Sequence, residues 1–170
     1  DSSGHLLVTT WNGTVRWQDG RFLPYLQGDS SKNLKVYVGR SGALWRWDEA
    51  GLHRSKDGTL SSYNIPLKPS RPDYIVLYET RNGDFWGKQG TEALFRISND
   101  VITRYAGQRT SSVSIENLWT MLEDRQGNLW FGTYKNGMLR YKDGEFTNYA
   151  TANGLSSNSI RSLFEDRKGT

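Results

Sequence analysis

The chain repeats itself along its length, and this repetition constrains the fold more than any other feature of the sequence. Leu163 to Gly169 matches Met121 to Gly127 almost residue for residue at a shift of 42 positions. A copy with the same spacing but altered residues lies 44 positions upstream, where Glu79 to Trp86 aligns with Glu123 to Trp130. Self-similarity at such a period is typical of solenoids and propellers.

Two further copies are recognised by their turns, since Asp19-Gly20 and Asp57-Gly58 align with Asp143-Gly144 at shifts of 124 and 86 positions. Within each copy, short runs of alternating apolar and polar residues are separated by turn residues, which predicts strands rather than helices. In the third complete copy we expect four strands, A to D, at Leu118 to Asp124, Leu129 to Thr133, Met138 to Lys142 and Phe146 to Tyr149.

Four short antiparallel strands form a small sheet that is not stable alone, so neighbouring copies must cover its faces. Radial packing around a channel covers the faces and protects the edges. The sequence therefore predicts an all-β fold of β-propeller blades of four antiparallel strands, with about four repeat units in 1–170. The units are expected at 1–25 (strands B to D of a blade), 33–63, 74–105 and 118–149 (blades), and 160–170 (strand A of a further or closing blade).

Composition argues against several classes of function. The net charge of +4 comes without a run of Lys or Arg, so no nucleic acid partner is expected. No window is apolar enough to span a membrane, so we expect no membrane contact by this segment. Cysteine is absent, and His5 and His53 occupy non-equivalent repeat positions, so neither a metal site nor a cofactor is predicted.

The third complete copy combines Glu123-Asp124-Arg125, Gly127 to Thr133 and Gly154 to Asn158 in one unit. In this combination the chain resembles the two-component regulator propeller repeat. The resemblance implies a periplasmic sensor segment of a membrane-anchored bacterial signalling protein, in a family that frequently senses oligosaccharides. It also implies that a histidine kinase or cyclase module of the parent protein lies outside this segment, which is expected to perform no catalysis.

The copies at the two ends look complementary. The chain opens in a strand B, Leu6 to Thr10, and closes after a strand A, Ile160 to Arg167. Three hypotheses follow: the segment is part of a larger ring, its ends join into a four-blade ring, or two copies exchange end strands. The expected protein partner is therefore the rest of the parent sensor or a second copy that completes the ring.

The recurrent polar and aromatic residues have a structural explanation. The Glu-Asp-Arg triplet recurs at one blade position, so its aspartate is expected to hold a turn by accepting backbone N–H groups. Trp45, Trp86 and Trp130 share one repeated position, and Trp17 and Tyr141 share another with an isoleucine. We expect these rings to lie in the core between blades. No catalytic residue is predicted.

Trp11, Trp47 and Trp119 lack an aromatic counterpart in every copy, and exposed aromatic faces can stack on sugar rings. In propellers the B to C and D to A connections share a face, so the loop from Gly154 to Asn158 should lie near them. A neutral or anionic sugar would be held there by stacking and by amide and cationic hydrogen bonds. The candidate ligand-binding residues are Trp11, Asn12, Trp47, Lys88, Trp119, Tyr134, Lys135, Asn136 and Arg161.

The function expected from these observations is an extracytoplasmic sensor propeller that binds a carbohydrate-like ligand, with oligosaccharide as the small-molecule partner, or that relays its recognition. A propeller that serves as a protein-interaction scaffold is the first alternative. A lyase-like propeller enzyme that needs a divalent metal is the second.

Overall fold

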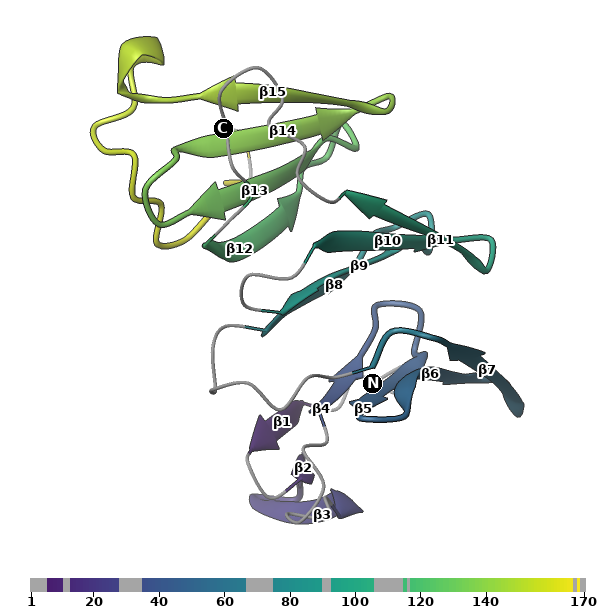
Figure 1. Ribbon diagram of the computed structural model, residues 1–170. Helices are drawn as coiled ribbons and strands as arrows, with labels where there is room; N and C mark the ends of the chain where they lie inside the picture. Colours follow the sequence, from purple (N-terminus) through teal and green to yellow (C-terminus); the bar gives the residue numbers. More distant parts are fainter. Residues whose placement is uncertain are drawn as a thin grey trace. The chain divides into compact units, whose positions relative to one another are not determined.

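The computed structural model describes residues 6–10, 13–27, 35–66, 75–89, 93–105, 115, 117–166 and 168. These residues belong to two compact units, Asp1–Arg71 and Pro72–Thr170. Within the described ranges the chain forms one three-stranded and three four-stranded antiparallel sheets, together with the single-turn 3-10 helix η1 (Thr151–Asn153) (Figure 1). The expected all-β fold of four-stranded propeller blades is confirmed for the three complete blades.

The first unit holds two sheets. The three-stranded sheet has the order β1-β2-β3, with strands β1 (Leu7–Thr10), β2 (Gly13–Gln18) and β3 (Arg21–Gln27). The four-stranded sheet has the order β4-β5-β6-β7, with strands β4 (Lys35–Val38), β5 (Leu44–Asp48), β6 (Gly51–Lys56) and β7 (Thr59–Tyr63). Each strand pairs with the next along the chain, which is the meander of a propeller blade.

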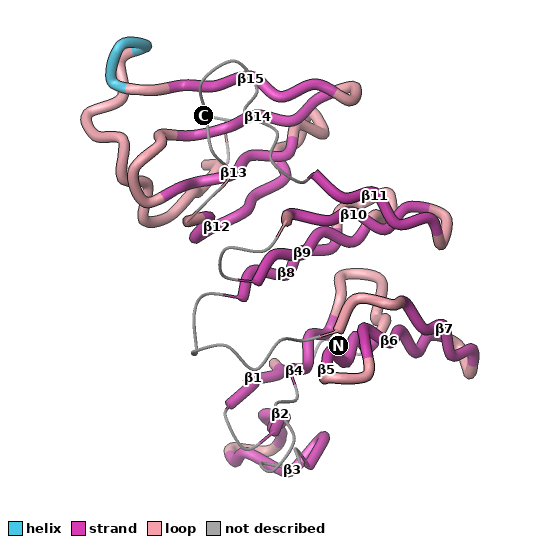
Figure 2. The backbone as a smooth tube through the Cα atoms, viewed as in Figure 1, coloured by secondary structure: helices cyan, strands magenta, loops and turns pink. Residues whose placement is uncertain are grey.

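The second unit holds the other two sheets, and each is again a meander (Figure 2). The strands of one sheet are β8 (Ile75–Glu79), β9 (Phe85–Gln89), β10 (Leu94–Ser98) and β11 (Val101–Tyr105). The strands of the other are β12 (Leu118–Glu123), β13 (Leu129–Thr133), β14 (Met138–Lys142) and β15 (Glu145–Tyr149). The four strands of this last sheet lie within one residue of the positions expected from the sequence.

The hairpin between the third and fourth strand of each complete blade closes on two residues of positive φ. Asp57-Gly58 has φ values of 49° and 77°, and Asp143-Gly144 has 49° and 90°. The same pair in the three-stranded sheet, Asp19-Gly20, has 51° and 77°. Two consecutive positive φ values define the type I′ turn, whose twist matches that of paired strands and which Asp-Gly adopts readily. The repeated Asp-Gly pairs therefore set the strand boundaries.

Asp124 holds the turn between β12 and β13, as its recurrence predicted. Its carboxylate accepts the backbone N–H of Gln126 at 3.0 Å and of Asn128 at 2.8 Å. It also accepts the Asn128 side-chain amide and the Trp130 indole N–H, each at 2.7 Å. Desolvation opposes ionisation, but these hydrogen bonds outweigh it and hold the pKa of Asp124 below its ordinary value.

The core of the second unit lies where the β8–β11 and β12–β15 sheets meet. Trp86 of β9 is fully buried and stacks on Tyr105 of its own sheet at 5.4 Å between ring centroids. From the following sheet, Tyr141 and Phe131 approach its ring edge-on at 4.9 and 5.5 Å. Leucines, one isoleucine and one methionine complete this cluster. Trp86 is therefore the inter-blade core residue that the repeat predicted.

Three rings expected in the core are not fully buried, although one of them, Tyr141, packs on Trp86 of the preceding sheet. Trp17 is 42% exposed, and Trp130 is half-buried at the edge of a cavity. Residues 160–166 form no ladder, because within the described ranges no strand pairs with them. The equivalence of this segment to a strand A stays a prediction.

Candidate functional site

Four of the residues singled out in the sequence come together at one end of the β12–β15 sheet. Trp119 of β12 and Tyr134, which directly follows β13, lie parallel with ring centroids 5.1 Å apart and an interplanar angle of 14°. In parallel offset stacking of this kind each ring covers part of one face of the other. Tyr134 is exposed and Trp119 is partly so.

A cation lies over each ring of this pair. The ammonium nitrogen of Lys135 is 5.4 Å from the centroid of Tyr134, and the guanidinium carbon of Arg161 is 5.3 Å from that of Trp119. Both distances are within the range of cation–π attraction. Within the described residues no carboxylate pairs with either cation, and both side chains are exposed. We call Trp119, Tyr134, Lys135 and Arg161 the aromatic–cation stack.

Backbone contacts fix the position of the stack. The N–H of Tyr134 donates to the carbonyl oxygen of Asn117 at 3.0 Å, and that of Ile160 donates to Thr133 at 2.8 Å. The Ser159 hydroxyl donates to the carbonyl oxygen of Tyr134. These bonds hold the segment that carries Arg161 against the end of β13.

Gly132 permits this close approach. A Cβ atom at position 132 would lie 2.6 Å from Thr120 Cγ2 and 2.7 Å from Ile160 Cγ2, which are distances that real Cβ atoms do not show. A side chain here would push the Arg161 segment away from the sheet. Gly132 is therefore required for the close packing that brings Arg161 to the stack.

The loop after β15 lies beside the loop after β13, as expected for connections on one face. The N–H of Gly137 donates to the carbonyl oxygen of Asn158 at 2.8 Å. The Asn158 side chain accepts the N–H of Thr151 at 2.9 Å and so fixes its own loop. Asn136, the fifth candidate of this group, is held by a bond from its N–H to Thr133 Oγ1 at 2.9 Å. Asn136 directly follows Lys135, a member of the aromatic–cation stack, in the sequence.

The remaining candidates lie elsewhere. Trp47 of β5 is a core residue, because it is 2% exposed and its indole N–H donates to the carbonyl oxygen of Ile65 at 2.6 Å. Lys88 was expected in a loop but lies in β9, every residue of which is buried. Neither offers a surface to a ligand in this structure, so both are left out of the proposed site. Trp11 and Asn12 lie outside the described residues.

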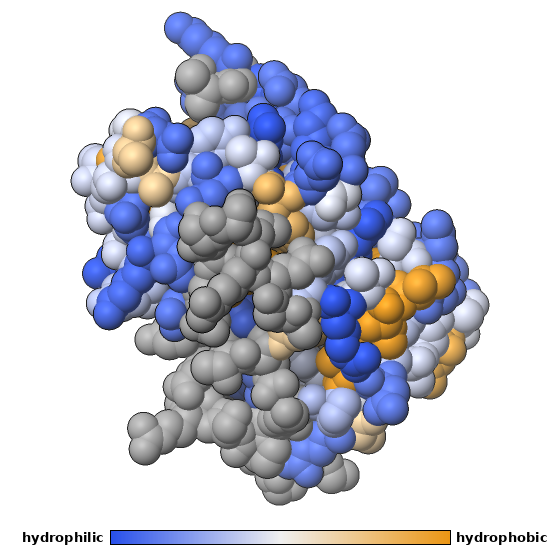
Figure 3. Space-filling model, turned by 45° about the horizontal axis from the view of Figure 1, so that its top comes forward, coloured by the Kyte–Doolittle hydropathy of each residue, from blue (hydrophilic) through white to orange (hydrophobic). Residues whose placement is uncertain are grey.

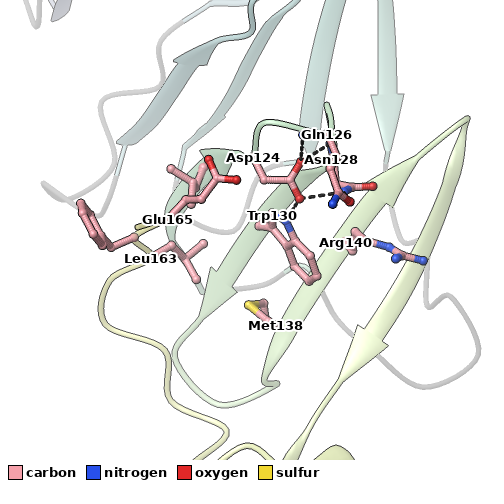
Figure 4. A pocket seen from close by; sticks show the side chains of 10 residues that line it. Asp124, Gln126, Asn128, Trp130, Met138, Arg140, Leu163 and Glu165 are labelled. Carbon is pink, nitrogen blue, oxygen red and sulfur yellow. Dashed lines mark hydrogen bonds between the residues drawn. The ribbon is translucent and has the colours of Figure 1, made fainter. Parts of the chain in front are cut away.

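The structure also reveals a cavity that the sequence did not indicate. It has a volume of about 360 Å³ and lies between the outer face of the β12–β15 sheet and residues 163–165 (Figure 4). Its walls are Leu122, Asp124, Gln126, Asn128, Trp130, Met138, Arg140, Leu163, Phe164 and Glu165. The sequence does distinguish this face from that of the preceding copy, because Asn128 stands where that copy has Asp84, which pairs with Arg96.

Neither a metal site nor a membrane-spanning helix is found among the residues that the structure describes. No three His, Cys, Asp or Glu side chains gather there as a candidate metal site. No helix in the same ranges combines the length and the apolar composition needed to cross a bilayer. On the face of the molecule seen in Figure 3, hydrophilic atoms predominate and hydrophobic ones form separate patches.

Comparison with known proteins supports the family resemblance. Residues 112–135, which include Trp119 and Tyr134, match the model of the family described as two component regulator propeller. No curated protein matches the chain.

Solved structures share the fold. An extracellular domain assigned to the hybrid two component system BT3049 of B. thetaiotaomicron superposes with a TM-score of 0.72 at 16% identity, covering 99% of this chain. The corresponding domain of BT4673 from the same organism gives 0.62 at 18% identity and also covers 99%. A protein assigned as a gluconolactonase gives 0.57 at 15% identity, with 85% of this chain and 58% of that one covered.

The chain spans 24% and 26% of the length of the two extracellular domains, so it corresponds to about a quarter of each. Identities this low show a common fold and nothing more specific. Taken with the family match at residues 112–135, they confirm the resemblance seen in the sequence. The chain is a β-propeller segment, and its residues 112–135 match the model of the two component regulator propeller family.

Proposed function

We propose that this chain is part of the extracytoplasmic sensor region of a bacterial two-component-type signalling protein, and that the aromatic–cation stack binds a carbohydrate-like ligand. The observation that carries the proposal is the stack itself. Two parallel rings with a cation over each stand on an exposed loop face, and four residues chosen from the sequence as ligand-binding candidates form it.

The chemistry of the stack fits a sugar. Pyranose rings present C–H faces that pack on aromatic surfaces, and their hydroxyl groups bond to amides and cations. Tyr134 and Trp119 supply aromatic rings, Asn136 supplies an amide, and Lys135 and Arg161 supply charge-assisted donors. We further propose that the segment performs no catalysis and that its role is to bind a ligand and pass on the bound state.

A thermal-shift screen of the purified chain against neutral and acidic oligosaccharides tests the proposal. A ligand that binds the folded state raises the unfolding midpoint in proportion to the logarithm of its concentration above Kd. The variants Trp119→Ala and Arg161→Gln should remove the shift. Lys56→Gln, an exposed cation in the other unit, should leave it unchanged.

The screen also discriminates the alternatives. A cooperatively folded chain that responds to no oligosaccharide, but to a second protein, would favour a protein-interaction scaffold. Turnover of a glycan only in the presence of a divalent metal would favour a lyase-like enzyme. Either result would contradict the proposed sensor role.

A further inference from the structure

The two cations of the aromatic–cation stack have no acidic counterpart. Lys135 and Arg161 each lie over one ring of the pair, at 5.4 and 5.3 Å from its centroid. Both side chains are exposed. Neither forms an ion pair or donates a hydrogen bond to another residue in the part of the chain that the structure describes. Their charges and their N–H donors are therefore available to a ligand.

The acidic residues of this sheet lie at its other end. The sequence has no Asp or Glu between 125 and 142, or between 146 and 164. The acidic residues that bound these stretches are Asp124, Asp143, Glu145 and Glu165. The strands alternate in direction, so the turns after β12 and β14 lie at one end of the sheet and the connections after β13 and β15 at the other. Glu165 lies with the first group, because it accepts the backbone N–H of Arg125 at 3.0 Å. Glu116, which precedes β12, is outside the described residues.

This separation of charge gives the stack a positive potential. Two cations that touch one aromatic pair belong to a single site, and no carboxylate of the described residues neutralises them. A surface with charge of one sign attracts ions of the opposite sign and raises their local concentration. Because both cations are exposed, salt should screen this attraction.

The backbone beside both cations is held by one buried residue, Thr133, which is 0% exposed. Its hydroxyl oxygen accepts the N–H of Asn136, directly after Lys135, at 2.9 Å. Its carbonyl oxygen accepts the N–H of Ile160, directly before Arg161, at 2.8 Å. A site whose backbone is fixed before the ligand arrives loses less conformational entropy on binding.

The stack is not part of the structural pattern of the blade. The preceding copy has Ile75, Gly90 and Thr91 at the positions of Trp119, Tyr134 and Lys135. That copy nevertheless forms the same four-stranded sheet. The rings and the lysine are therefore not needed to build a blade, which leaves a binding role open to them.

The exposed groups suit an acidic sugar better than a neutral one. Each ring covers part of one face of the other and also has a cation over it, so less aromatic face is left for a sugar. The N–H donors of a guanidinium lie in its own plane, and contact with a ring leaves them available. A carboxylate or a sulfate ester adds charge attraction to the hydrogen bonds that these donors form, whereas a neutral hydroxyl does not.

We propose that the ligand of the aromatic–cation stack is an acidic oligosaccharide. Its carboxylate or sulfate groups are bound by Arg161 and Lys135, and one of its sugar rings contacts Tyr134. This inference rests on the proposed carbohydrate-binding function and adds the charge of the ligand to it. Because the site has two cations, an oligomer with a charge on successive sugars should bind more tightly than a single acidic sugar.

Isothermal titration calorimetry with matched pairs of ligands tests the charge. Tetrasaccharides of galacturonate are compared with their methyl esters, and carrageenan tetrasaccharides with their desulfated forms, which separates carboxylate from sulfate recognition. At least one acidic member should bind about tenfold more tightly than its neutral partner at low salt. Added salt should weaken the binding of the acidic member only. Equal affinities within both pairs, with binding lost in Trp119→Ala, would overturn the acidic ligand and leave the carbohydrate site intact. Binding of no oligosaccharide would contradict both.

Charge-removing variants locate the contact. Lys135→Gln and Arg161→Gln should each weaken the acidic tetrasaccharide about threefold and leave its neutral partner unaffected. Lys56→Gln removes an exposed cation of the other unit and should change neither affinity. An equal loss in Lys56→Gln would show attraction to the net positive chain instead of binding at the stack. Inorganic sulfate that binds as tightly as the tetrasaccharide would show an anion site without sugar recognition, and either result overturns the proposal.

Discussion

The guanidinium of Arg81 donates to the carbonyl oxygen of Asp124 at 2.7 Å and so joins the first turn of one blade to the end of strand β12 in the next. The same guanidinium reaches the carbonyl oxygen of Glu123 at 3.2 Å, and the backbone N–H of Arg81 donates to the Glu123 carboxylate at 2.8 Å. Arg125 makes a similar contact with the segment after β15: its backbone N–H donates to the Glu165 carboxylate at 3.0 Å and its guanidinium donates to the carbonyl oxygen of Asp166 at 3.0 Å. In both cases an arginine in the turn after the first strand of a sheet bonds to a Glu-Asp pair about 42 residues further along the chain, and we call this contact the clamp.

Replacing Arg81 by Gln should loosen the clamp. Because the guanidinium is partly exposed, the loss in free energy of unfolding should be about 1 kcal/mol. Urea unfolding followed by tryptophan fluorescence measures it. Lys142→Gln, at the exposed last residue of β14, is the control and should leave the midpoint unchanged. Equal effects of the two changes would contradict the clamp.

The Asp124 carboxylate should make stability depend on pH. Its pKa is held below the ordinary value in the folded state, so its contribution is complete above about pH 4, the pKa of an unfolded aspartate. The contribution falls as the pH drops through the lower folded pKa. The stability difference between parent and Asp124→Asn should therefore shrink from pH 6 to acid. A difference that stays constant or grows on acidification would refute this role, and Asp143→Asn serves as the exposed control.

Gly137→Ala should be more harmful than the same change at Gly144. Both glycines have positive φ, at 78° and 90°, which an alanine adopts at a cost of about 1 kcal/mol. At position 137 the new Cβ would also clash with the carbonyl oxygen of Tyr149, whereas nothing lies within 4 Å of it at 144. Thermal unfolding should give an additional loss of roughly 1–3 kcal/mol for Gly137→Ala. Similar losses for the two variants would mean that the backbones are not this close.

Much of the fold follows from the sequence, because blade strands and turns depend on local signals. The alternation of apolar and polar residues predicted the strands. Asp143-Gly144 predicted a turn with two positive φ values, which only a few residue types form readily. Burial was harder to predict because it depends on what lies opposite. Trp86 and Trp130 share one repeat position, yet one is covered and the other lines a cavity. Trp47 looked available from sequence, but its indole bonds to the core backbone at Ile65.

The candidate site likewise has features that the sequence predicts and features that only the structure shows. Tyr134 and Trp119 were found from their position in the repeat, since the loop geometry of a blade is local and repeated. The stacking of their rings could not be read from the sequence, because it depends on the close approach that Gly132 permits.

Alkaline titration tests the contact between the β8–β11 and β12–β15 sheets, where Tyr105 lies beside Tyr141. Desolvation, followed by the hydrogen bond with Tyr141, raises the pKa of Tyr105 to about 12. Its contribution to stability should be complete below about pH 10, the pKa of an unfolded tyrosine, and should be lost as the pH rises through 12. Tyr105→Phe should remove this part of the pH dependence. Parallel curves for parent and variant between pH 9 and about pH 12 would show that Tyr105 is not desolvated there.

The most direct test of the proposed site is an NMR titration of the seven tryptophan indole N–H signals with the best oligosaccharide from the thermal screen. The account predicts a saturable shift of the Trp119 signal, assigned through Trp119→Phe, while those of the buried Trp45, Trp47 and Trp86 stay in place. A ligand that stabilises the chain but leaves the Trp119 signal unmoved would contradict binding at the aromatic–cation stack.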